Sequence, residues 1–331
     1  MTPKIASSFL ASIALVGCFA NVDNQKEVTV YVSADEQIAR EVFAAFTKKT
    51  GIEVLWVGDT EASKTTALVQ RLLREVNDPV ADVFWSSEIL GTIQLAQKNV
   101  LASNDTESTL AWPAQYRDAE HRWFAFSPRA RVIAYDPKKV AKEDLPKTWW
   151  EFGGAAMADP RFGTTRTHVA AMALFPKQFS AFVKTVNEKP LLGGNAATVQ
   201  QVVDGTAMFA MTDSDDVHAA VARGESVAMY APLHHEGENG GTLLIPNTVA
   251  VIQGCAHPEL AATFVDFMLS EEVAELLAKS PSHNIPLQQQ VAKQFSELQV
   301  ENPLEVDFYS AAALQEESVA QLMKAQGDEE E

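Results

Sequence analysis

The first hundred residues alternate between short β-branched, aromatic segments and helical segments, and this alternation constrains the fold more than any other feature. Three strand-like segments are each followed by a segment with apolar residues at helical spacing: 28–32 by 34–50, 52–57 by 67–75, and 81–85 by 89–97. This order predicts a parallel sheet flanked by helices. Ser33 followed by Glu36 also predicts a capping box at the start of the first helix.

The pattern changes near residue 123 but remains one of strands and helices. The predicted strands are 123–126, 131–137, 207–212, 227–230 and 243–252, and the predicted helices lie at 165–187, 199–204, 214–223, 258–269 and 271–279. A chain of 331 residues with 47% hydrophobic content exceeds the usual size of a single core. We therefore expect two α/β lobes of roughly 150 residues each.

The first 17 residues have the pattern of a bacterial export signal. Lys4 precedes an apolar run from Ile5 to Val16, which is too short to span a bilayer comfortably. The tetrapeptide that ends in Cys18 resembles a lipobox, so we expect Cys18 to be lipidated and to anchor the protein in the cell envelope. The alternative is an ordinary signal peptide. Cys255 is then the only other cysteine, which leaves no partner for an intrachain disulfide.

Charge and motifs argue against several classes of function. The formal net charge is −18 and no basic stripe is visible, so nucleic acid is not an expected partner. The chain has no nucleophile elbow, phosphate loop, zinc-protease helix or dinucleotide fingerprint. We expect a binding protein and not an enzyme, with a secreted hydrolase as the alternative.

Six short segments, taken in order from Val28 to about Leu287, resemble the periplasmic substrate-binding proteins of ferric-iron-type ABC transporters. They are TGIEV at 50–54, ADVFW at 81–85, RARVIAYD at 129–136, VDGTA at 203–207, GESV at 224–227 and FVDFMLS at 264–270. The resemblance implies the two-lobed type II periplasmic binding protein fold, each lobe a mostly parallel sheet flanked by helices. It places residues 26–126 with 249–331 in lobe one and 127–248 in lobe two, joined by crossover strands.

The same resemblance implies a monomer that captures a small ligand by hinge closure and delivers it to an ABC permease and ATPase. It implies no cofactor, and Fe(III) is the expected transported ligand. A sensor subunit that signals to a membrane kinase has the same fold and is an alternative.

Ligands of open α/β sheets bind beyond the carboxyl ends of the strands, next to helix N-termini. This rule predicts ligand-binding residues after three of the strands. The turn at 163–166 and Arg129, just before the strand at 131–137, add further candidates. Together, the predicted ligand-binding residues are Ser33, Asp35, Ser87, Glu88, Arg129, Thr164, Thr165, Arg166, Asp213, Asp215 and Asp216. For Ser33, Asp213 and Glu88, a helix-capping role is the alternative to ligand contact.

In the iron-binding members, a histidine and a carboxylate from one lobe and two adjacent tyrosines from the other hold the ferric ion. The resemblance aligns these positions with Asp35, with Ser87 and Glu88, and with Asp215 and Asp216. This chain has no Tyr-Tyr pair. The predicted metal ligands are therefore the carboxylates of Asp35, Glu88, Asp215 and Asp216, which suit a hard cation.

Two further readings of the polar residues stay open. Arg129, Arg131 or Arg166 could neutralise the aspartates, so that hydroxyls and helix N-termini bind an oxyanion-bearing solute such as a phosphonate or a sugar phosphate. A second cluster rich in metal-ligating types is His234, His235, Glu236 and Glu238, expected to be solvated in its Gly-rich loop. His283 is a further candidate near the cleft.

Overall fold

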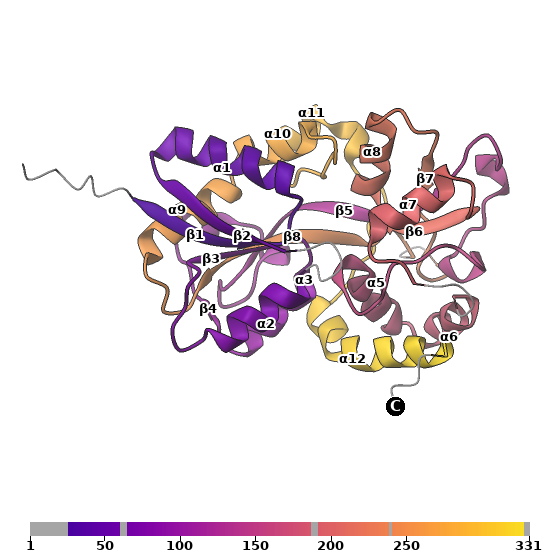
Figure 1. Cartoon of the computed structure of the whole chain (residues 1–331), viewed down its shortest axis with the longest axis horizontal. Helices are drawn as coiled ribbons and strands as arrows, with labels where there is room; N and C mark the ends of the chain where they lie inside the picture. Colours follow the sequence, from indigo (N-terminus) through magenta and orange to yellow (C-terminus); the bar gives the residue numbers. More distant parts are fainter. Residues whose placement is uncertain (1–25, 60–64, 187–190, 238–239, 328–331) are drawn as a thin grey trace, which may run out of the picture.

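The computed structural model describes residues 26–59, 65–186, 191–237 and 240–327, and they form two α/β lobes (Figure 1). The predicted export signal at 1–17 and the predicted lipidation site Cys18 lie outside the described residues. None of the helices in the described ranges has the length and apolar character required to cross a membrane. The two-lobed α/β fold class predicted from the sequence is confirmed.

The first lobe contains the opening strand and helix pairs together with two helices from later in the chain. Its strands are β1 (Glu27–Val32), β2 (Glu53–Gly58), β3 (Val83–Ser86) and β4 (Leu101–Ala102). Its helices are α1 (Glu36–Thr50), α2 (Thr66–Arg74), α3 (Ile89–Gln97), α4 (Glu107–Ala111), the 3-10 helix η2 (Ala114–Tyr116), α9 (Pro258–Met268) and α10 (Glu271–Lys279).

The second lobe contains β6 (Phe209–Asp213) and β7 (Ala228–Tyr230), and it shares two longer strands, β5 (Phe124–Tyr135) and β8 (Leu244–Ile252), with the first lobe (Figure 1). Its helices are η3 (Lys142–Asp144), η4 (Trp149–Glu151), α5 (Gly163–Ala173), α6 (Pro176–Thr185), α7 (Asn195–Val203) and α8 (Ser214–Ala222). The chain ends with α11 (Gln289–Gln294), η5 (Ser296–Leu298) and α12 (Phe308–Ala325).

Strand pairing is more mixed than the sequence predicted. The strand order is β2-β1-β3-β8-β5-β6, with β4 beside β8 and β7 beside β5. The pairs β1–β2 and β1–β3 are parallel, as expected for strand-helix-strand units. All pairs that involve β5 or β8 are antiparallel, so the expectation of a mostly parallel sheet in the second lobe is wrong for its named strands. The antiparallel pairs arise because β5 and β8 cross between the lobes in opposite directions.

The two strands predicted at 123–126 and 131–137 are one continuous strand, β5. Its register against β8 shifts between Phe126 and Arg129. Ser127 there has a φ of 38°, and the side-chain amide of Asn247 donates a hydrogen bond of 2.7 Å to its carbonyl. Ser127 and Pro128 resemble a turn in the sequence, but in the structure they form an irregularity inside a buried strand.

Each lobe is a sheet with an apolar core on both faces. In β1, Val28, Val30 and Val32 pack into one core cluster, whereas Tyr31 packs into the cluster on the other face. This alternation follows from the two-residue period of side chains in a strand. The second lobe likewise has two clusters, one around Trp149 and the other around α7 and α8.

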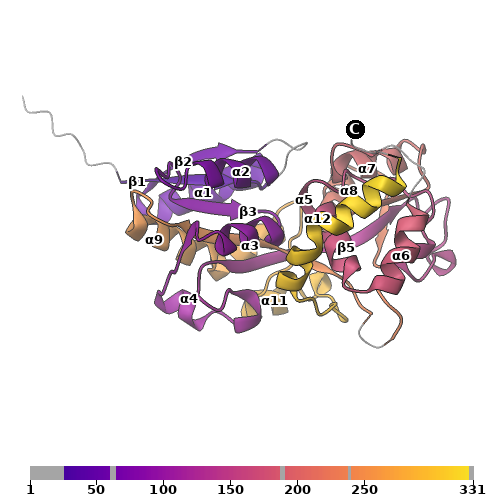
Figure 2. The ribbon, with the colours of Figure 1, turned by 90° about the horizontal axis from the view of Figure 1, so that it is seen from below.

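Helix α12 connects the cores of the two lobes (Figure 2). Ala311 and Ala312 near its start belong to a core cluster of the first lobe, and Leu322 near its end belongs to a cluster of the second. The segment before it also packs on the second lobe, where Ile285 joins the cluster of α7 and α8. The sequence assigned residues 249–331 to lobe one and did not anticipate this packing; the lobe limits themselves stay a prediction.

We predict that Phe264→Ala lowers the free energy of unfolding by about 3–5 kcal/mol, because it removes a buried ring from the centre of the first-lobe core. Phe264 is fully buried, and its ring centroid lies 5.0 Å from that of Phe46 and 6.0 Å from that of Phe43. Urea unfolding measures the change. Val221→Ala is the control: Val221 is 50% exposed, so its truncation should cost less than about 0.5 kcal/mol. Equal costs would contradict the assignment of this core.

Candidate functional site

A polar cavity lies between the two lobes, beyond the carboxyl ends of β1, β3 and β6. Its volume is ≈ 600 Å³, including the part that is open to solvent. Helices α5 and α7 begin at residues in its wall, and the N-cap residue of α8, Asp213, lies there too, so the positive ends of three helix dipoles meet at the cavity. The wall is formed by Asp35, Ser87, Arg129, Ala158, Asp159, Phe162, Gly163, Thr164, Thr165, Gly193, Gly194, Asn195, Asp213, Asp215, Asp216 and Ala219.

The structure brings most of the predicted ligand-binding residues together at this cavity. Eight of them are in its wall: Asp35, Ser87, Arg129, Thr164, Thr165, Asp213, Asp215 and Asp216. Ser33, Glu88 and Arg166 lie behind the wall and do not line the cavity. Segments that are distant in the sequence therefore meet where the rule of strand ends places them.

Asp213 is held by side chains around the cavity and does not cap its helix. It occupies the N-cap position of α8, but its carboxylate accepts no capping hydrogen bond. One oxygen accepts from Arg131 Nη1 at 3.1 Å, and the other accepts from Thr164 Oγ1 at 2.5 Å and from Asn195 Nδ2 at 2.9 Å. The capping alternative for Asp213 is therefore wrong.

Arg131 is the buried cation that balances Asp213. Its side chain is fully buried, and it donates to Asp213, to Thr165 Oγ1 at 3.2 Å and to His168 Nδ1 at 3.3 Å. A buried carboxylate without such a partner would cost several kcal/mol. This ion pair thus fixes the end of β6, from which α8 begins.

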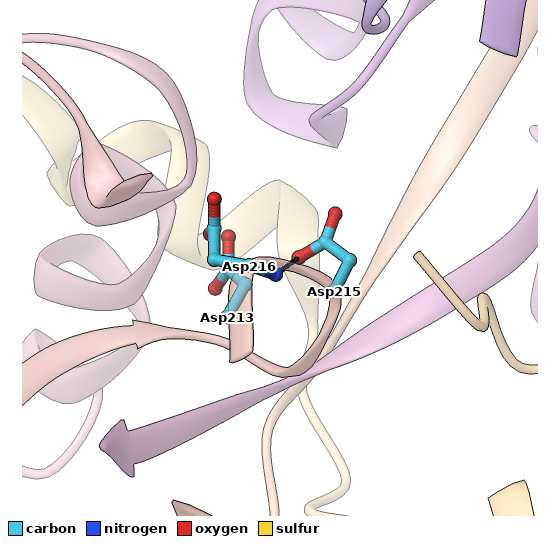
Figure 3. A group of neighbouring side chains, drawn as sticks. All are labelled: Asp213, Asp215 and Asp216. Carbon is cyan, nitrogen blue, oxygen red and sulfur yellow. Dashed lines mark hydrogen bonds between the residues drawn. The ribbon is translucent and has the colours of Figure 1, made fainter. Parts of the chain in front are cut away.

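Asp213, Asp215 and Asp216 form an acidic group at the start of α8 (Figure 3). One carboxylate oxygen of each lies within 4.8 Å of the others. Asp215 Oδ1 accepts from the backbone N–H of Asp216 at 3.1 Å, and Thr212 Oγ1 donates to Asp216 at 3.1 Å. Carboxylates at this spacing repel one another unless a cation lies among them.

Arg129 is the second cation at this group, beside Arg131. Its Nε lies 3.3 Å from Asp215 Oδ2 and 3.6 Å from Asp213 Oδ2, and its Nη2 donates to the backbone carbonyl of Ser87 in the other lobe. Burial alone lowers the pKa of Arg129, but nearby negative charges raise it by more, and the net pKa lies above its ordinary value. The carboxylates responsible are, in decreasing order, Asp215, Asp213, Asp216 and Asp35.

Glu88 is a helix cap and a contact between the lobes. It is fully buried and accepts from the backbone N–H groups of Leu90 and Gly91, at 2.7 and 2.9 Å. From the second lobe, Arg166 Nη2 donates to it at 3.2 Å and Thr167 Oγ1 at 3.0 Å. Both oxygens are thus occupied, and Glu88 is not a member of the acidic group that the sequence predicted it to join.

Ser33 supports the cavity wall from behind. The predicted capping box with Glu36 is wrong: α1 begins at Glu36, and its N-cap is Asp35. Ser33 Oγ instead accepts a hydrogen bond of 2.9 Å from the backbone N–H of Ser87, and it lies 3.1 Å from Thr65 Oγ1. These bonds link the ends of β1 and β3 and so position Ser87.

The sequence missed Asn195, which lines the second-lobe wall, and His168, which accepts a hydrogen bond from Arg131. Asn195 is the first residue of α7 and bonds to Asp213, Arg131 and Thr164. The Gly193-Gly194 pair before a helical pattern was a signal that could have indicated this helix start. His168 accepts a hydrogen bond from Arg131, but in the sequence it lies in an apolar helical segment where no rule indicates such a role.

The loop histidines are separated by the fold. His235 is half-buried, with its ring centroid 4.7 Å from that of Phe175. His234, expected to be solvated, is fully buried, with its ring centroid 5.2 Å from that of His168. Its Nδ1 donates to the Gly241 carbonyl at 2.8 Å. Burial lowers the pKa of His234 to about 3, and burial followed by the charge of Arg131 lowers the pKa of His168 well below its ordinary value.

Comparisons with known proteins agree with this architecture. Residues 32–275 match the family model described as bacterial extracellular solute-binding protein. The chain is 27% identical over 290 residues to iron uptake protein A1 of Synechocystis sp., covering 77% of this chain and 74% of that one. It is 25% identical over 265 residues to the major ferric iron-binding protein of Neisseria gonorrhoeae, covering 74% and 76%.

The fold is also that of solved structures. Iron-bound HitA from Pseudomonas aeruginosa superposes with a TM-score of 0.77 at 21% identity, covering 91% of this chain and 99% of that one. At this level of identity the likeness concerns the fold.

We predict that the buried histidines make the protein less stable as the pH falls below about 6.5. The folded-state pKa of His234 is about 3, against 6.5 in the unfolded chain, so between these values only the unfolded state binds the proton. Each buried histidine contributes a slope of up to roughly 1.4 kcal/mol per pH unit in this window.

Urea unfolding of His234→Gln between pH 5 and 7.5 tests this. The free energy of unfolding should depend less steeply on pH in this variant than in the wild type, even if the variant is less stable at pH 7.5. His235→Gln, at the less buried neighbouring position, should keep the wild-type slope. Parallel curves for all three proteins would refute the assignment.

Proposed function

The chain belongs to the bacterial extracellular solute-binding proteins, and from this premise we propose that it captures ferric iron, alone or as a small complex, between its two lobes. The proposal includes delivery of this cargo to the permease and ATPase of an ABC importer from the periplasmic side of the membrane. The protein acts as a monomeric carrier, and catalysis has no part in its role.

The observation that carries the proposal is the acidic group at the start of α8. The oxygens of Asp213, Asp215 and Asp216 lie within 4.8 Å of one another, and Asp35 of the other lobe lines the same cavity. Carboxylate oxygens are ligands for hard cations. The resemblance of the sequence to the iron-binding members implies that Asp215 and Asp216 correspond to the tyrosine pair and Asp35 to the histidine. The proposed cargo would thus meet ligands from both lobes.

The charge balance of the cavity supports a cationic cargo. Five carboxylates line the cavity: Asp35, Asp159, Asp213, Asp215 and Asp216. They outnumber the three guanidinium groups that pair with members of this set, those of Arg129, Arg131 and Arg161. Asp213 is largely occupied by Arg131, Thr164 and Asn195. Asp35, Asp215 and Asp216, which line the cavity from both lobes, are the proposed ligands, and Asp213 supports them.

An oxyanion-bearing organic solute is less well supported. That alternative requires arginines available to the ligand, but Arg131 is bound to Asp213, and Arg129 contacts Asp213, Asp215 and the Ser87 carbonyl. Arg166, the third candidate, is engaged by Glu88 and does not line the cavity. An anion in the cavity would then be bound by the N-termini of α5, α7 and α8 alone, without a cationic side chain.

Asp215→Asn should lower the affinity for ferric iron at least about tenfold, because it removes one anionic ligand, and a tenfold change corresponds to ~1.4 kcal/mol. Competition of the apoprotein with citrate for Fe(III) measures this affinity. Asp159→Asn is the matched control: it makes the same charge change in the same cavity, but Asp159 pairs with Arg161 and lies outside the acidic group. If Asp215→Asn changed only thermal stability and left iron affinity intact, a structural role would replace the proposed one.

The ferric complex should lack the strong visible absorption of tyrosinate bound to iron. None of the five tyrosines of the chain is in the wall of the cavity. Visible spectra on addition of ferric citrate, with binding confirmed by a rise in melting temperature, test this. An intense charge-transfer band on binding would contradict the all-carboxylate site.

Anchoring through Cys18 completes the proposal, since the lipobox pattern supports it. The wild-type protein expressed with its N-terminal segment should partition into detergent, and Cys18→Ser should stay in the aqueous phase. Equal partitioning of the two proteins would indicate an ordinary signal peptide. An adjacent permease and ATPase gene pair would favour import, and a histidine kinase gene would favour the sensor alternative.

A further inference from the structure

A second group of metal-ligating side chains lies outside the acidic cavity. His218 of α8 and His283, in the segment between α10 and α11, have ring centroids 4.8 Å apart at an interplanar angle of 59°. Both are half-buried, and both line a cavity of ≈ 620 Å³, including its solvent-open part, together with Glu297. In Figure 1, α8 lies beside α10 and α11.

We propose that His218 and His283 bind a divalent cation of borderline softness, such as Zn²⁺, Ni²⁺ or Cu²⁺, at a site distinct from the iron site. Imidazole nitrogens suit these ions, whereas the carboxylates of the acidic cavity suit hard cations. Water would complete the coordination.

The separation of the rings fits a shared ion. A metal–nitrogen bond of about 2.0–2.1 Å places each imidazole centroid about 3.2 Å from the metal. Two rings on one ion then have centroids about 4.5–5.5 Å apart for N–metal–N angles between about 90° and 120°. The observed 4.8 Å lies inside this range.

His283 is oriented as a metal ligand requires. Its Nδ1 lies 3.0 Å from the backbone carbonyl of Ala278, which can only accept, so Nδ1 carries the proton and Nε2 keeps its lone pair. Metal-binding histidines have this second-shell bond to a carbonyl or carboxylate. The backbone of His283 has a φ of 47°, an unfavourable conformation that the fold maintains here.

The other close histidine pair shows why spacing alone is insufficient. The His168 and His234 centroids are 5.2 Å apart, but Arg131 donates to His168 at 3.3 Å, so a fixed positive charge opposes any cation there. Around His218 and His283, by contrast, none of the described residues lining the cavity is lysine or arginine, and Glu297 adds a negative charge.

Calorimetric titration of the metal-free full chain with ZnCl₂ at pH 7.5 tests the proposal. One equivalent should bind the wild type, and His218→Ala and His283→Ala should each weaken that binding at least about tenfold. His235→Ala, which removes a histidine outside this cavity, should bind as the wild type does. Asp215→Asn should also retain Zn²⁺ binding, so this site can succeed or fail independently of the proposed iron site.

A spectroscopic measurement identifies the ligands of the bound ion, and the variants define which results would overturn the proposal. Electron paramagnetic resonance of bound Cu²⁺ should show coupling to two ligand nitrogens in the wild type and to fewer in His283→Gln, a variant that serves if an alanine variant misfolds. Loss of Zn²⁺ binding in Asp215→Asn but not in the histidine variants would place the ion in the acidic cavity and overturn the proposal. So would binding that only His235→Ala weakens, or the absence of Zn²⁺ binding to the wild type.

Discussion

The buried ion pair between Arg131 and Asp213 is the interaction on which the acidic cavity depends. Two charges removed from water are tolerated only with close partners and satisfied hydrogen bonds, and here Thr164, Thr165 and Asn195 supply those bonds. The same bonds tie the first turns of α5 and α7 to the end of β6. The first turn of α8 is therefore fixed in place. It holds the carboxylates of Asp215 and Asp216 close together although they repel each other.

Other side chains make the contacts between the lobes. Glu88 of the first lobe receives hydrogen bonds from Arg166 and Thr167 of the second, and Arg129 of β5 donates to the carbonyl of Ser87. If the lobes separated, Glu88 would still cap its own helix, because its carboxylate accepts hydrogen bonds from the backbone N–H groups of Leu90 and Gly91. Separation therefore costs the bonds to Arg166 and Thr167 without leaving a bare buried carboxylate, a property suited to a contact that must form and break.

The sequence was sufficient to predict where the site lies, but not the role of each residue in it. Strand ends and helix starts are local patterns, so Asp35, Ser87 and Asp215 were predicted at the cavity and are found there. The roles of Ser33 and Asp213 are set by partners far away in the chain, which local capping rules do not see. The same limit explains the single strand β5: Ser127 and Pro128 resemble a turn until β8 pairs with both sides of them.

Helix α12 limits how the two lobes can move relative to each other. It contributes Ala311 and Ala312 to one core and Leu322 to the other, so it is a third connection beside β5 and β8. A packed helix tolerates small sliding, whereas pulling Leu322 from its core would cost several kcal/mol. A rotation that opened the cavity and kept α12 seated on the second lobe would slide its first turns over α3 and the first-lobe core. The small side chains of Ala311 and Ala312 at that end are consistent with such sliding, because they offer little to interlock.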